Sequence, residues 1–378
     1  MSSVAPLHTV SIVGARPQFV KLAPVARAMR AAPRPIVDQI VHTGQHYDDS
    51  MSRVFFDELD LPAPSVNLGI GSGAQGRQTA RMLEAIEDYL QANRPHVVIV
   101  YGDTNSTLAG ALAAAKLHIP VAHVEAGLRS FNRRMPEELN RILTDHLARL
   151  LFAPTATAVA NLATEGLSAR TLLSGDVMYD AVLYNAARAA ARSAIVRTLG
   201  LEPGAYAVAT IHRAENTAPA ELARLLQQLN EAATRHGRIV FPVHPRTAAV
   251  LRSGSAAWQP VAAVRMIEPV GYLDMLALLQ GARCVLTDSG GLQKEAYFLG
   301  CPCLTLRNET EWTETLRDGA NHIAGSDGKH LLQLLDEQAR RPQRRCGEPP
   351  SAAAGPFGDG HAARHIVAAL CELDEAQS

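Results

Sequence analysis

The hydrophobic positions of this chain gather in short runs, each followed by a polar turn and a stretch with helical periodicity. Residues 97–100, Val-Val-Ile-Val, are continuously apolar, as expected for a parallel strand buried on both faces. The repeated order of strand, turn and helix predicts an α/β protein with doubly wound parallel sheets. The expected strands are residues 9–13, 36–42, 97–100, 121–124, 150–153, 206–211, 239–243, 264–267, 285–286 and 303–306.

The strand and helix pattern restarts in the middle of the chain, near Ser174-Gly175-Asp176, just before the alanine-rich residues 181–199. A length of 378 residues is better explained by two domains of ordinary size than by one. We therefore expect one domain in residues 1–178 and a second in residues 179–357. The segment 358–378 contains a last helix that is expected to pack back across the first domain.

Polar side chains in the first half collect where expected strands end or the next helix begins. Because open α/β sheets bind ligands at the carboxyl edge of their strands, these side chains are candidate site residues. Solvation at a helix start is the alternative for Lys21, and compensation of the helix dipole is the alternative for Glu138. The candidates in this half are Arg16, Lys21, Asp103, Glu125, Glu137 and Arg141.

The second half carries cations and hydrogen-bond donors at the matching positions. Residues 288–291, Asp-Ser-Gly-Gly, form a tight turn before a helix, where free backbone N–H groups and the positive helix end attract an anion. The two glycines let a phosphate approach the backbone, and Glu295 lies within reach of an attached sugar. A tight connection without a ligand is the alternative for this turn. The candidates in this half are His212, Arg213, His244, Arg246, Gly271, Ser289, Gly290, Gly291, Glu295 and Arg307.

Composition narrows the class of ligand. The formal net charge is −1, so we expect no general attraction to nucleic acid or to an anionic membrane surface. No apolar run approaches the roughly 20 residues of a membrane span, and the N-terminus does not resemble a signal peptide. The sequence therefore predicts a soluble cytoplasmic protein that recognises its ligand at a local site.

The cysteines and the first glycine turn exclude several kinds of site. The five cysteines are an odd number without paired CxxC spacing, which argues against a disulfide framework and against structural zinc. Residues 301–303, Cys-Pro-Cys, are interpreted as free thiols in a reducing compartment, with a redox pair as the alternative. The turn at residues 14–18 is neither a GxGxxG fingerprint nor a P-loop, so a dinucleotide site of the Rossmann type is not supported.

Cations in one half and carboxylates in the other fit a nucleotide diphosphate sugar held in a cleft between two domains. Such a site supports two chemistries. In glycosyl transfer, one base deprotonates an acceptor hydroxyl. In elimination and readdition, the diphosphate leaves C1, a base removes the C2 proton, and the unsaturated sugar is reprotonated on the other face. The second chemistry needs at least two carboxylates and a firm hold on the diphosphate, which three acids and a cationic wall fit better.

The resemblance to one family becomes specific when the motifs are read in order. In their order and over nearly the whole chain, they resemble the motifs of the bacterial non-hydrolysing UDP-N-acetylglucosamine 2-epimerases. The motifs are Gly14-Ala15-Arg16-Pro17-Gln18 with Lys21, Gly44-Gln45-His46, Gly102-Asp103-Thr104, His123-Val124-Glu125-Ala126-Gly127-Leu128-Arg129, Met135-Pro136-Glu137-Glu138 with Asn140-Arg141, His212-Arg213 with Glu215-Asn216, Pro242-Val243-His244-Pro245, Thr287-Asp288-Ser289-Gly290-Gly291 and Gly358-Asp359-Gly360.

The resemblance implies a GT-B fold, two Rossmann-like domains with the active site in the cleft between them. It implies C2 epimerisation of UDP-N-acetylglucosamine to UDP-N-acetylmannosamine through a 2-acetamidoglucal-type intermediate, for cell-surface polysaccharide biosynthesis. No nicotinamide cofactor, no catalytic metal and a homodimer are also implied. Carried onto this chain, Asp103, Glu125, Glu137 and His212 are the implied catalytic residues. The implied UDP-sugar contacts are Arg16, Lys21, Arg141, His244, Gly271, Ser289, Gly290, Gly291, Glu295 and Arg307.

The chain also departs from the usual family pattern. It reads His212-Arg213-Ala214-Glu215 where relatives often read His-Arg-Arg-Glu, and the loop 69–75 lacks the Arg-Gln pair associated with a second, activating UDP-sugar site. Residues 130–134 and 310–312 resemble relatives that epimerise UDP-2,3-diacetamido-2,3-dideoxyglucuronate. Arg133 or Arg134 would then pair with the uronate, unless both are solvated. Epimerisation of that sugar, or a GT-B glycosyltransferase, is the alternative function, and a non-catalytic UDP-sugar sensor is disfavoured.

Overall fold

The structure, a computed structural model, describes residues 5–45, 56–213, 215–256, 258–317, 319–325, 327–340 and 355–375. His46, Ala214, Cys346 and most of a helix expected near residues 51–59 lie outside these ranges. The chain forms two compact units, Met1–Ala181 with Ala353–Ser378 as unit 1, and Val182–Ala352 as unit 2. The boundary expected at residues 178 and 179 lies inside helix α7 (Val177–Arg192).

Unit 1 contains a seven-stranded parallel sheet in the order β3-β2-β1-β4-β5-β6-β7. Every residue of β4 is buried, which explains why this strand reads as a continuous apolar run rather than as an alternating one. Its strands are β1 (Leu7–Val13), β2 (Ile36–His42), β3 (Val66–Asn67), β4 (Val97–Tyr101), β5 (Val121–Val124), β6 (Leu150–Ala153) and β7 (Thr171–Leu173).

Unit 2 contains a six-stranded parallel sheet in the order β10-β9-β8-β11-β12-β13. Leucines of α9, at positions 222, 226 and 229, pack with Phe241 of β9 in the core of this unit. The strands are β8 (Ala207–Thr210), β9 (Ile239–Pro242), β10 (Val264–Ile267), β11 (Cys284–Thr287), β12 (Cys303–Thr305) and β13 (Asn321–Ile323).

Both sheets reverse their strand order at one point, between β1 and β4 in unit 1 and between β8 and β11 in unit 2. The turns after adjacent strands diverge at such a switch point, and open α/β sheets bind their ligands there. The turns that follow β4 and β11 carry Asp103 and Ser289, respectively. The fold therefore places predicted site residues of each half where a ligand is expected.

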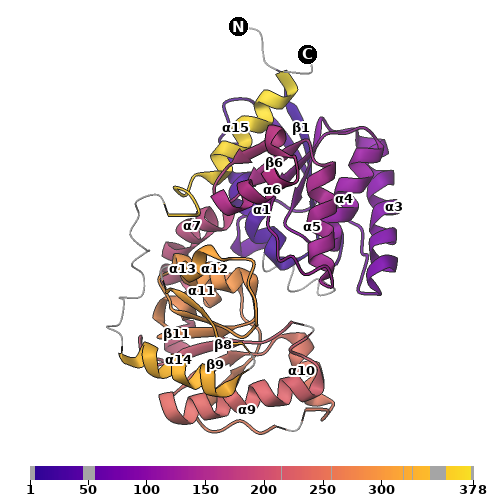
Figure 1. Ribbon diagram of the computed structural model, residues 1–378. Helices are drawn as coiled ribbons and strands as arrows, with labels where there is room; N and C mark the ends of the chain where they lie inside the picture. The colour runs from indigo at the N-terminus through magenta and orange to yellow at the C-terminus, as the bar shows by residue number, and fades with distance from the viewer. Residues whose placement is uncertain are drawn as a thin grey trace. The chain divides into compact units, whose positions relative to one another are not determined.

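Helices connect the strands in both units (Figure 1). In α4, Gly110 leaves room for the sheet, because a Cβ at this position would lie 3.0 Å from Ile12 of β1. The helices of unit 1 are α1 (Arg16–Arg30), α3 (Gln75–Asn93), α4 (Asn105–Lys116), α5 (Pro136–Leu147), α6 (Ala156–Thr164), the short η1 (Ser168–Arg170) and α15 (Ala362–Glu375). After α7, those of unit 2 are α8 (Ile195–Thr198), α9 (Pro219–His236), α10 (Pro245–Arg252), α11 (Tyr272–Gly281), α12 (Gly290–Phe298), α13 (Glu314–Arg317) and α14 (Gly328–Arg340).

The C-terminal helix α15 packs against α1 within unit 1 (Figure 1). The carboxylate of Asp180 accepts hydrogen bonds from the backbone N–H groups of Ala362 and Ala363 at 3.1 and 2.9 Å. Arg34 donates to the carbonyl of Cys371 near the other end of the helix. A carboxylate from another helix therefore satisfies two N–H groups that the first turn of α15 leaves unpaired.

Asp38 of β2 predicts a pH dependence of stability. Burial raises the pKa of Asp38 from 3.8 to about 6, although hydrogen bonds from Thr9 and Ser11 act to lower it. The pKa of Asp38 is higher in the folded than in the unfolded protein. Its contribution to the free energy of unfolding is therefore fully present below pH 4 and is lost as the pH rises through 6. In the wild type we expect the free energy of unfolding to fall by on the order of 1–3 kcal/mol between pH 4 and 7, and Asp38→Asn should not show this fall. Urea unfolding of both proteins across this range tests the prediction, and a pH-independent difference would contradict it.

Candidate active site

Gln18 joins the two turns at the switch point of unit 1. Its Oε1 accepts hydrogen bonds from the backbone N–H groups of Gly14 and Ala15 at 2.8 and 3.0 Å. Its Nε2 donates to the carbonyl of Tyr101, the last residue of β4, at 3.0 Å. Because this side chain is completely buried, the bonds hold the turn after β1 against the turn that carries Asp103.

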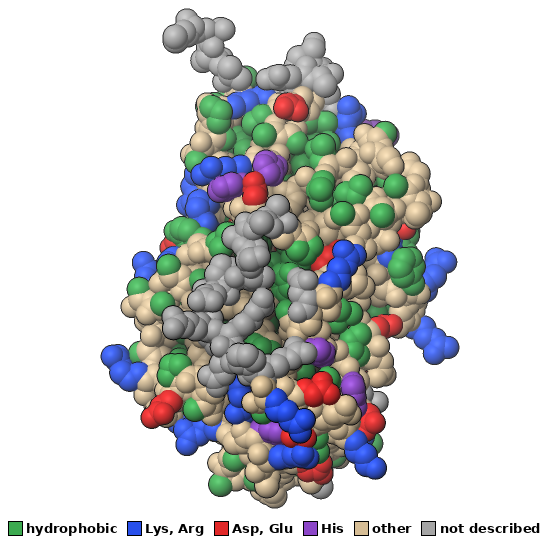
Figure 2. Space-filling model, turned by 60° about the vertical axis from the view of Figure 1, so that its left-hand side comes forward, with side chains coloured by type: hydrophobic (Ala, Val, Ile, Leu, Met, Phe, Trp, Pro, Cys, Tyr) green, Lys and Arg blue, Asp and Glu red, His purple; other side chains and the backbone are tan. Residues whose placement is uncertain are grey.

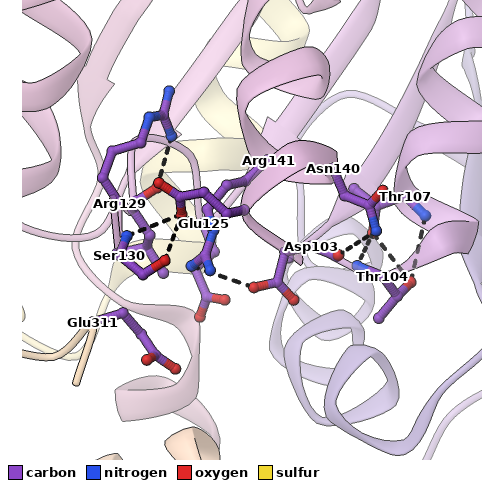
Figure 3. A network of polar contacts seen from close by, with 12 residues as sticks. Asp103, Thr104, Thr107, Glu125, Arg129, Ser130, Asn140, Arg141 and Glu311 are labelled. Carbon is purple, nitrogen blue, oxygen red and sulfur yellow. Dashed lines mark hydrogen bonds and ion pairs between the residues drawn. The ribbon is translucent and has the colours of Figure 1, made fainter. Parts of the chain in front are cut away.

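Several contacts hold the turn that carries Asp103. Figure 3 shows those made by Asn140 and Arg141 of α5. Gly102 has φ +64°, a left-handed conformation that favours glycine, and its carbonyl lies 2.7 Å from Nε2 of His123. The carbonyl of Asp103 accepts a hydrogen bond from Asn140 at 2.9 Å. The Asp103 carboxylate pairs with Arg141 at 3.5 Å, and its side chain is 31% exposed, so it remains accessible to a ligand.

Glu125 follows β5 in a left-handed conformation, with φ +74°. The backbone of a non-glycine residue is strained in this conformation, and such strain is common at functional sites. Its Oε1 lies 2.5 Å from Nζ of Lys21, and both residues are buried. The alternative interpretation, in which Lys21 is a solvated residue at a helix start, is therefore wrong. The pair also lies beside Gly102, because a Cβ added there would be 2.8 Å from Lys21 Nζ and 3.5 Å from Glu125 Oε1.

The two acids at the start of α5 have different surroundings. Glu138 is buried and accepts hydrogen bonds from the N–H and hydroxyl of Ser130 and from the N–H of Phe131. Its carboxylate also lies 3.0 Å from Nε of Arg141, so it holds the preceding loop and an arginine rather than only compensating a helix dipole. Glu137 is half-buried, and its side chain makes no hydrogen bond or ion pair with another described residue.

A buried charge network beneath this site was missed in the sequence. His123 has Nε2 at 2.7 Å from the Gly102 carbonyl and Nδ1 at 2.7 Å from Asp145. Arg129 contacts the other oxygen of Asp145 at 2.7 Å and binds Glu165 through two N–H groups. Burial acts to raise the pKa of Asp145, but the contacts with His123 and Arg129 outweigh it and hold the pKa below its ordinary value. An ionised Asp145 and a carbonyl oxygen are both acceptors, so each ring nitrogen of His123 faces an acceptor.

One signal for this network was present in the sequence. Glu138, Arg141 and Asp145 are separated by three and four residues, which places them on one face of a helix. That face is buried in α5. Charged residues on a buried helix face must be paired, so the spacing alone pointed to partners elsewhere in the unit.

In unit 2, Asp288 organises the turn after β8. It is completely buried and accepts hydrogen bonds from the backbone N–H groups of His212 and Arg213 at 2.9 Å, and from the Asn216 amide at 3.0 Å. Nδ1 of His212 lies 3.1 Å from the same carboxylate. Burial acts to raise the pKa of Asp288, yet the contacts with His212 and the backbone hold it below its ordinary value. The ionised carboxylate therefore orients the His212 ring.

A second imidazole lies beside His212. The ring centroids of His212 and His244 are 5.1 Å apart. His244 is the N-cap of α10, and its Nδ1 accepts a hydrogen bond from the backbone N–H of Arg246 at 3.2 Å. Accepting at Nδ1 leaves the proton of a neutral ring on Nε2, as a donor. The Arg246 guanidinium in turn donates to the carbonyl of His212 at 2.9 Å.

The turn at residues 288–291 does begin a helix. Ser289 is the N-cap of α12, and its hydroxyl accepts from the N–H of Leu292. Gly290 and Gly291 form the first turn of this helix, where backbone N–H groups have no partner within the helix. Glu295 follows as a buried residue of the same helix. These features meet the requirements of an anion site at a helix N-terminus.

The remaining predicted site residues lie at helix starts or strand ends. Arg16 is the first residue of α1 and is half-buried, and Gly271 is the N-cap of α11. Arg307, after β12, is buried and donates to Glu311 at 2.9 Å. Unit 1 thus brings Lys21, Asp103, Glu125 and Arg141 together, and unit 2 brings His212, His244 and Arg246 together.

Charge distribution, metal ligands, helix hydrophobicity and cysteines can be compared with the expectations from the sequence. On the face seen in Figure 2, basic and acidic side chains are interspersed, in keeping with a net charge of −1. In the described ranges, no cluster of three or more His, Cys, Asp and Glu side chains could hold a metal ion. Among the helices described, none has the length and apolar character needed to cross a membrane. The described cysteines, Cys284, Cys301, Cys303 and Cys371, are free thiols.

Comparisons with known proteins agree with the motifs. Residues 28–371 match the model of a family described as UDP-N-acetylglucosamine 2-epimerase. A UDP-N-acetylglucosamine 2-epimerase homolog from Methanococcus maripaludis is 49% identical over 88% of this chain and 92% of its own. The UDP-2,3-diacetamido-2,3-dideoxy-D-glucuronate 2-epimerase of Pseudomonas aeruginosa is 45% identical over 97% of this chain and 100% of its own.

A solved structure shows the same architecture. The Methanocaldococcus jannaschii UDP-GlcNAc 2-epimerase, in complex with UDP-GlcNAc and UDP, has a TM-score of 0.89 and 40% sequence identity. The comparison covers 97% of this chain and 100% of that one. The expected α/β architecture, two Rossmann-like domains of the GT-B class, is confirmed. The roles assigned to individual residues stay predictions.

Proposed function

Because the chain belongs to the UDP-N-acetylglucosamine 2-epimerase family and is an epimerase, we propose that it interconverts UDP-N-acetylglucosamine and UDP-N-acetylmannosamine without net hydrolysis. The observation that carries this proposal is the difference between the two switch points. Beside the one in unit 1 lie the carboxylates Asp103, after β4, and Glu125, after β5, and the one in unit 2 presents cations and the N-terminus of α12. Proton transfer and retention of a diphosphate are thus assigned to different units.

The proposed reaction begins with elimination. The bond between C1 and the diphosphate oxygen breaks, its electron pair stays on UDP, and a carboxylate takes the C2 proton. The resulting C1–C2 double bond is the 2-acetamidoglucal-type intermediate. Proton donation to the opposite face of C2 and return of the diphosphate oxygen to C1 give the epimer, so atoms and charge balance. Each step needs UDP to remain bound while it is separate from the sugar.

Unit 2 supplies groups for that retention. We assign the diphosphate to the N–H groups of Gly290 and Gly291, with His212 and His244 as ring donors. The buried Asp288 carboxylate holds Nδ1 of His212 and so fixes the direction of the other ring nitrogen. A fixed donor stabilises the charge that develops on the leaving oxygen without reorganisation at the moment of reaction. Glu295 is assigned to the ribose, and Ser289, Arg16 and Gly271 to the remaining UDP contacts.

Unit 1 supplies the proton transfer groups. Asp103 and Glu137 have the exposure that contact with a sugar requires, and Lys21 holds Glu125 beside Gly102, the neighbour of Asp103. Lys21 therefore acts on the sugar through Glu125, and Arg141 acts through Asp103. A base and an acid on opposite faces of C2 require at least two such groups. The network that contains His123 supports the site by holding the Gly102 carbonyl.

The second candidate substrate is UDP-2,3-diacetamido-2,3-dideoxyglucuronate, for the same chemistry. It is favoured by the 45% identity to the Pseudomonas aeruginosa enzyme, which spans 97% of this chain. Arg133 and Arg134 are exposed in the loop before α5, where a guanidinium can pair with a carboxylate.

We further propose a cytoplasmic homodimer. Leu139 and Leu143, one turn apart on α5, are 40% and 50% exposed, as an apolar contact between copies would require.

Isotope exchange tests the proposed function. Incubation with either UDP-sugar in deuterated water should place deuterium at C2 of both epimers, because the C2 proton passes through a carboxylate that exchanges with solvent. Mass spectrometry and proton NMR give the readout, and the sugar that exchanges faster is the substrate. If neither sugar exchanges, the assignment fails. UDP that accumulates only when a sugar acceptor is added would instead indicate a glycosyltransferase.

A further inference from the structure

Glu311 lies at the N-terminus of α12, where a phosphate group is expected. A Cβ added to Gly290 would be 2.5 Å from Oε1 of Glu311, so this oxygen occupies the space beside the first turn of the helix. The space beside such a turn attracts negative charge. A carboxylate of the chain itself therefore stands in the position of an external anion.

Two arginines hold this carboxylate. Nη1 of Arg307 donates to Oε2 of Glu311 at 2.9 Å, and Nη2 of Arg213 lies 3.4 Å from Oε1. The three side chains are at most 20% exposed, so water screens the interaction only partly. Both arginines follow strands of the same sheet, Arg213 after β8 and Arg307 after β12. The carboxylate thus bridges two cations and a helix N-terminus.

Glu311 does not satisfy all the donors of Arg307. The side chain of Arg307 is 3% exposed, and its Nε is a buried donor without a hydrogen-bond partner among the described residues. A buried donor without a partner costs free energy, so a ligand oxygen that reaches it gains a hydrogen bond that Glu311 does not supply. A diphosphate has more acceptor oxygens and more charge than a carboxylate, and it can satisfy more of these donors.

We propose that Glu311 occupies the diphosphate site when no nucleotide is bound and is displaced by the diphosphate of UDP. The inference rests on the proposed function, because it requires a nucleotide diphosphate at α12. In the empty site, Glu311 keeps two arginines paired, and burial without a counter-charge would be costly for them. The same pairing opposes UDP binding, since both anions need the same cations. Glu311 thereby sets how tightly UDP is held and permits its exchange.

The substitution Glu311→Gln tests the competition. The amide has the same size but no charge, so it leaves Arg213 and Arg307 to the diphosphate. Titration calorimetry with UDP should give an affinity about 5- to 30-fold higher than that of the wild type. Glu309→Gln is the matched control, because it removes one charge from an exposed position two residues away. This control should bind UDP within about twofold of the wild type.

The alternative role for Glu311 is to position the arginines for the nucleotide, and it predicts the opposite result. Unchanged or weaker UDP binding by Glu311→Gln, with an unaltered melting temperature, would overturn the proposal. A crystal structure of the wild type with UDP provides a second measurement that needs no variant. We expect the contact between Glu311 and Arg307 to be broken in it, and a retained 2.9 Å contact beside bound UDP contradicts displacement. If the wild type does not bind UDP, the proposed function itself fails.

Discussion

Asp103→Asn is expected to lower the rate of C2 proton exchange by about 10³-fold. The amide has the shape of the carboxylate but cannot accept the C2 proton. The backbone contacts of this turn, from Asn140 to the Asp103 carbonyl and from His123 to the Gly102 carbonyl, do not involve the substituted group. The loss should therefore reflect chemistry rather than a displaced turn. Deuterium incorporation at C2, measured under single-turnover conditions, gives the rate.

UDP affinity separates a lost base from a damaged site. Asp103 is not among the residues assigned to UDP, most of which lie in unit 2, so Asp103→Asn should bind UDP within about threefold of the wild type. Asp88→Asn, on the exposed face of α3, makes the same chemical change away from the site and should exchange at the normal rate. Glu137→Gln should also lose exchange. Near-normal exchange by both Asp103→Asn and Glu137→Gln would refute the assigned proton transfer.

Asp145→Asn is expected to destabilise the protein by about 3–5 kcal/mol, the largest effect on stability that we predict. The substitution removes the negative charge that lies 2.7 Å from both His123 and Arg129, two side chains that are almost completely buried. In the asparagine, an NH₂ donor also takes the place of one acceptor oxygen. This donor then faces either the N–H of Gly127, which is itself a donor, or a cation. A fall of about 10 °C in melting temperature should accompany the loss of free energy.

The pH dependence of this effect has a defined sign. The pKa of Asp145 is lower in the folded protein, so its stabilisation is present above the unfolded pKa and disappears as the pH falls through the folded value. The difference between wild type and Asp145→Asn should thus be constant near neutrality and shrink below about pH 4. Thermal melts at several pH values measure it, with Asp88→Asn as the control. A difference that grows on acidification would be inconsistent with an ionised Asp145.

Several parts of the fold and of the candidate site could be predicted from the local sequence. The strand at residues 36–42 was predicted with the bounds that β2 has, because a buried strand and its flanking turns are short-range patterns. A helix was predicted after the tight turn at residues 288–291, and α12 begins within that turn, at Gly290. The position of Asp103 at a strand end followed in the same way. These features depend on neighbours within a few residues.

Contacts between side chains that are far apart in the sequence could not be predicted. Lys21 and Glu125 are 104 residues apart, and the contact between them requires that β1 and β5 flank β4 in the sheet. Asp288 was assigned to a turn that presents its groups to an anion, yet its carboxylate is buried and holds the backbone of His212 and Arg213. Glu311 had no assigned partner, because the approach of its carboxylate to Gly290 depends on the loop after β12.

The sequence by itself determined the class of the fold, the order of its elements and the family, because periodicity, turn chemistry and ordered motifs are properties of local segments. Only the tertiary structure decided which charges are paired. It placed Lys21 on Glu125, His123 between Asp145 and the Gly102 carbonyl, and Glu311 beside the N-terminus of α12. Pairing decides whether a buried charge is stabilised or must find a ligand, and it depends on distances that strand order and burial create.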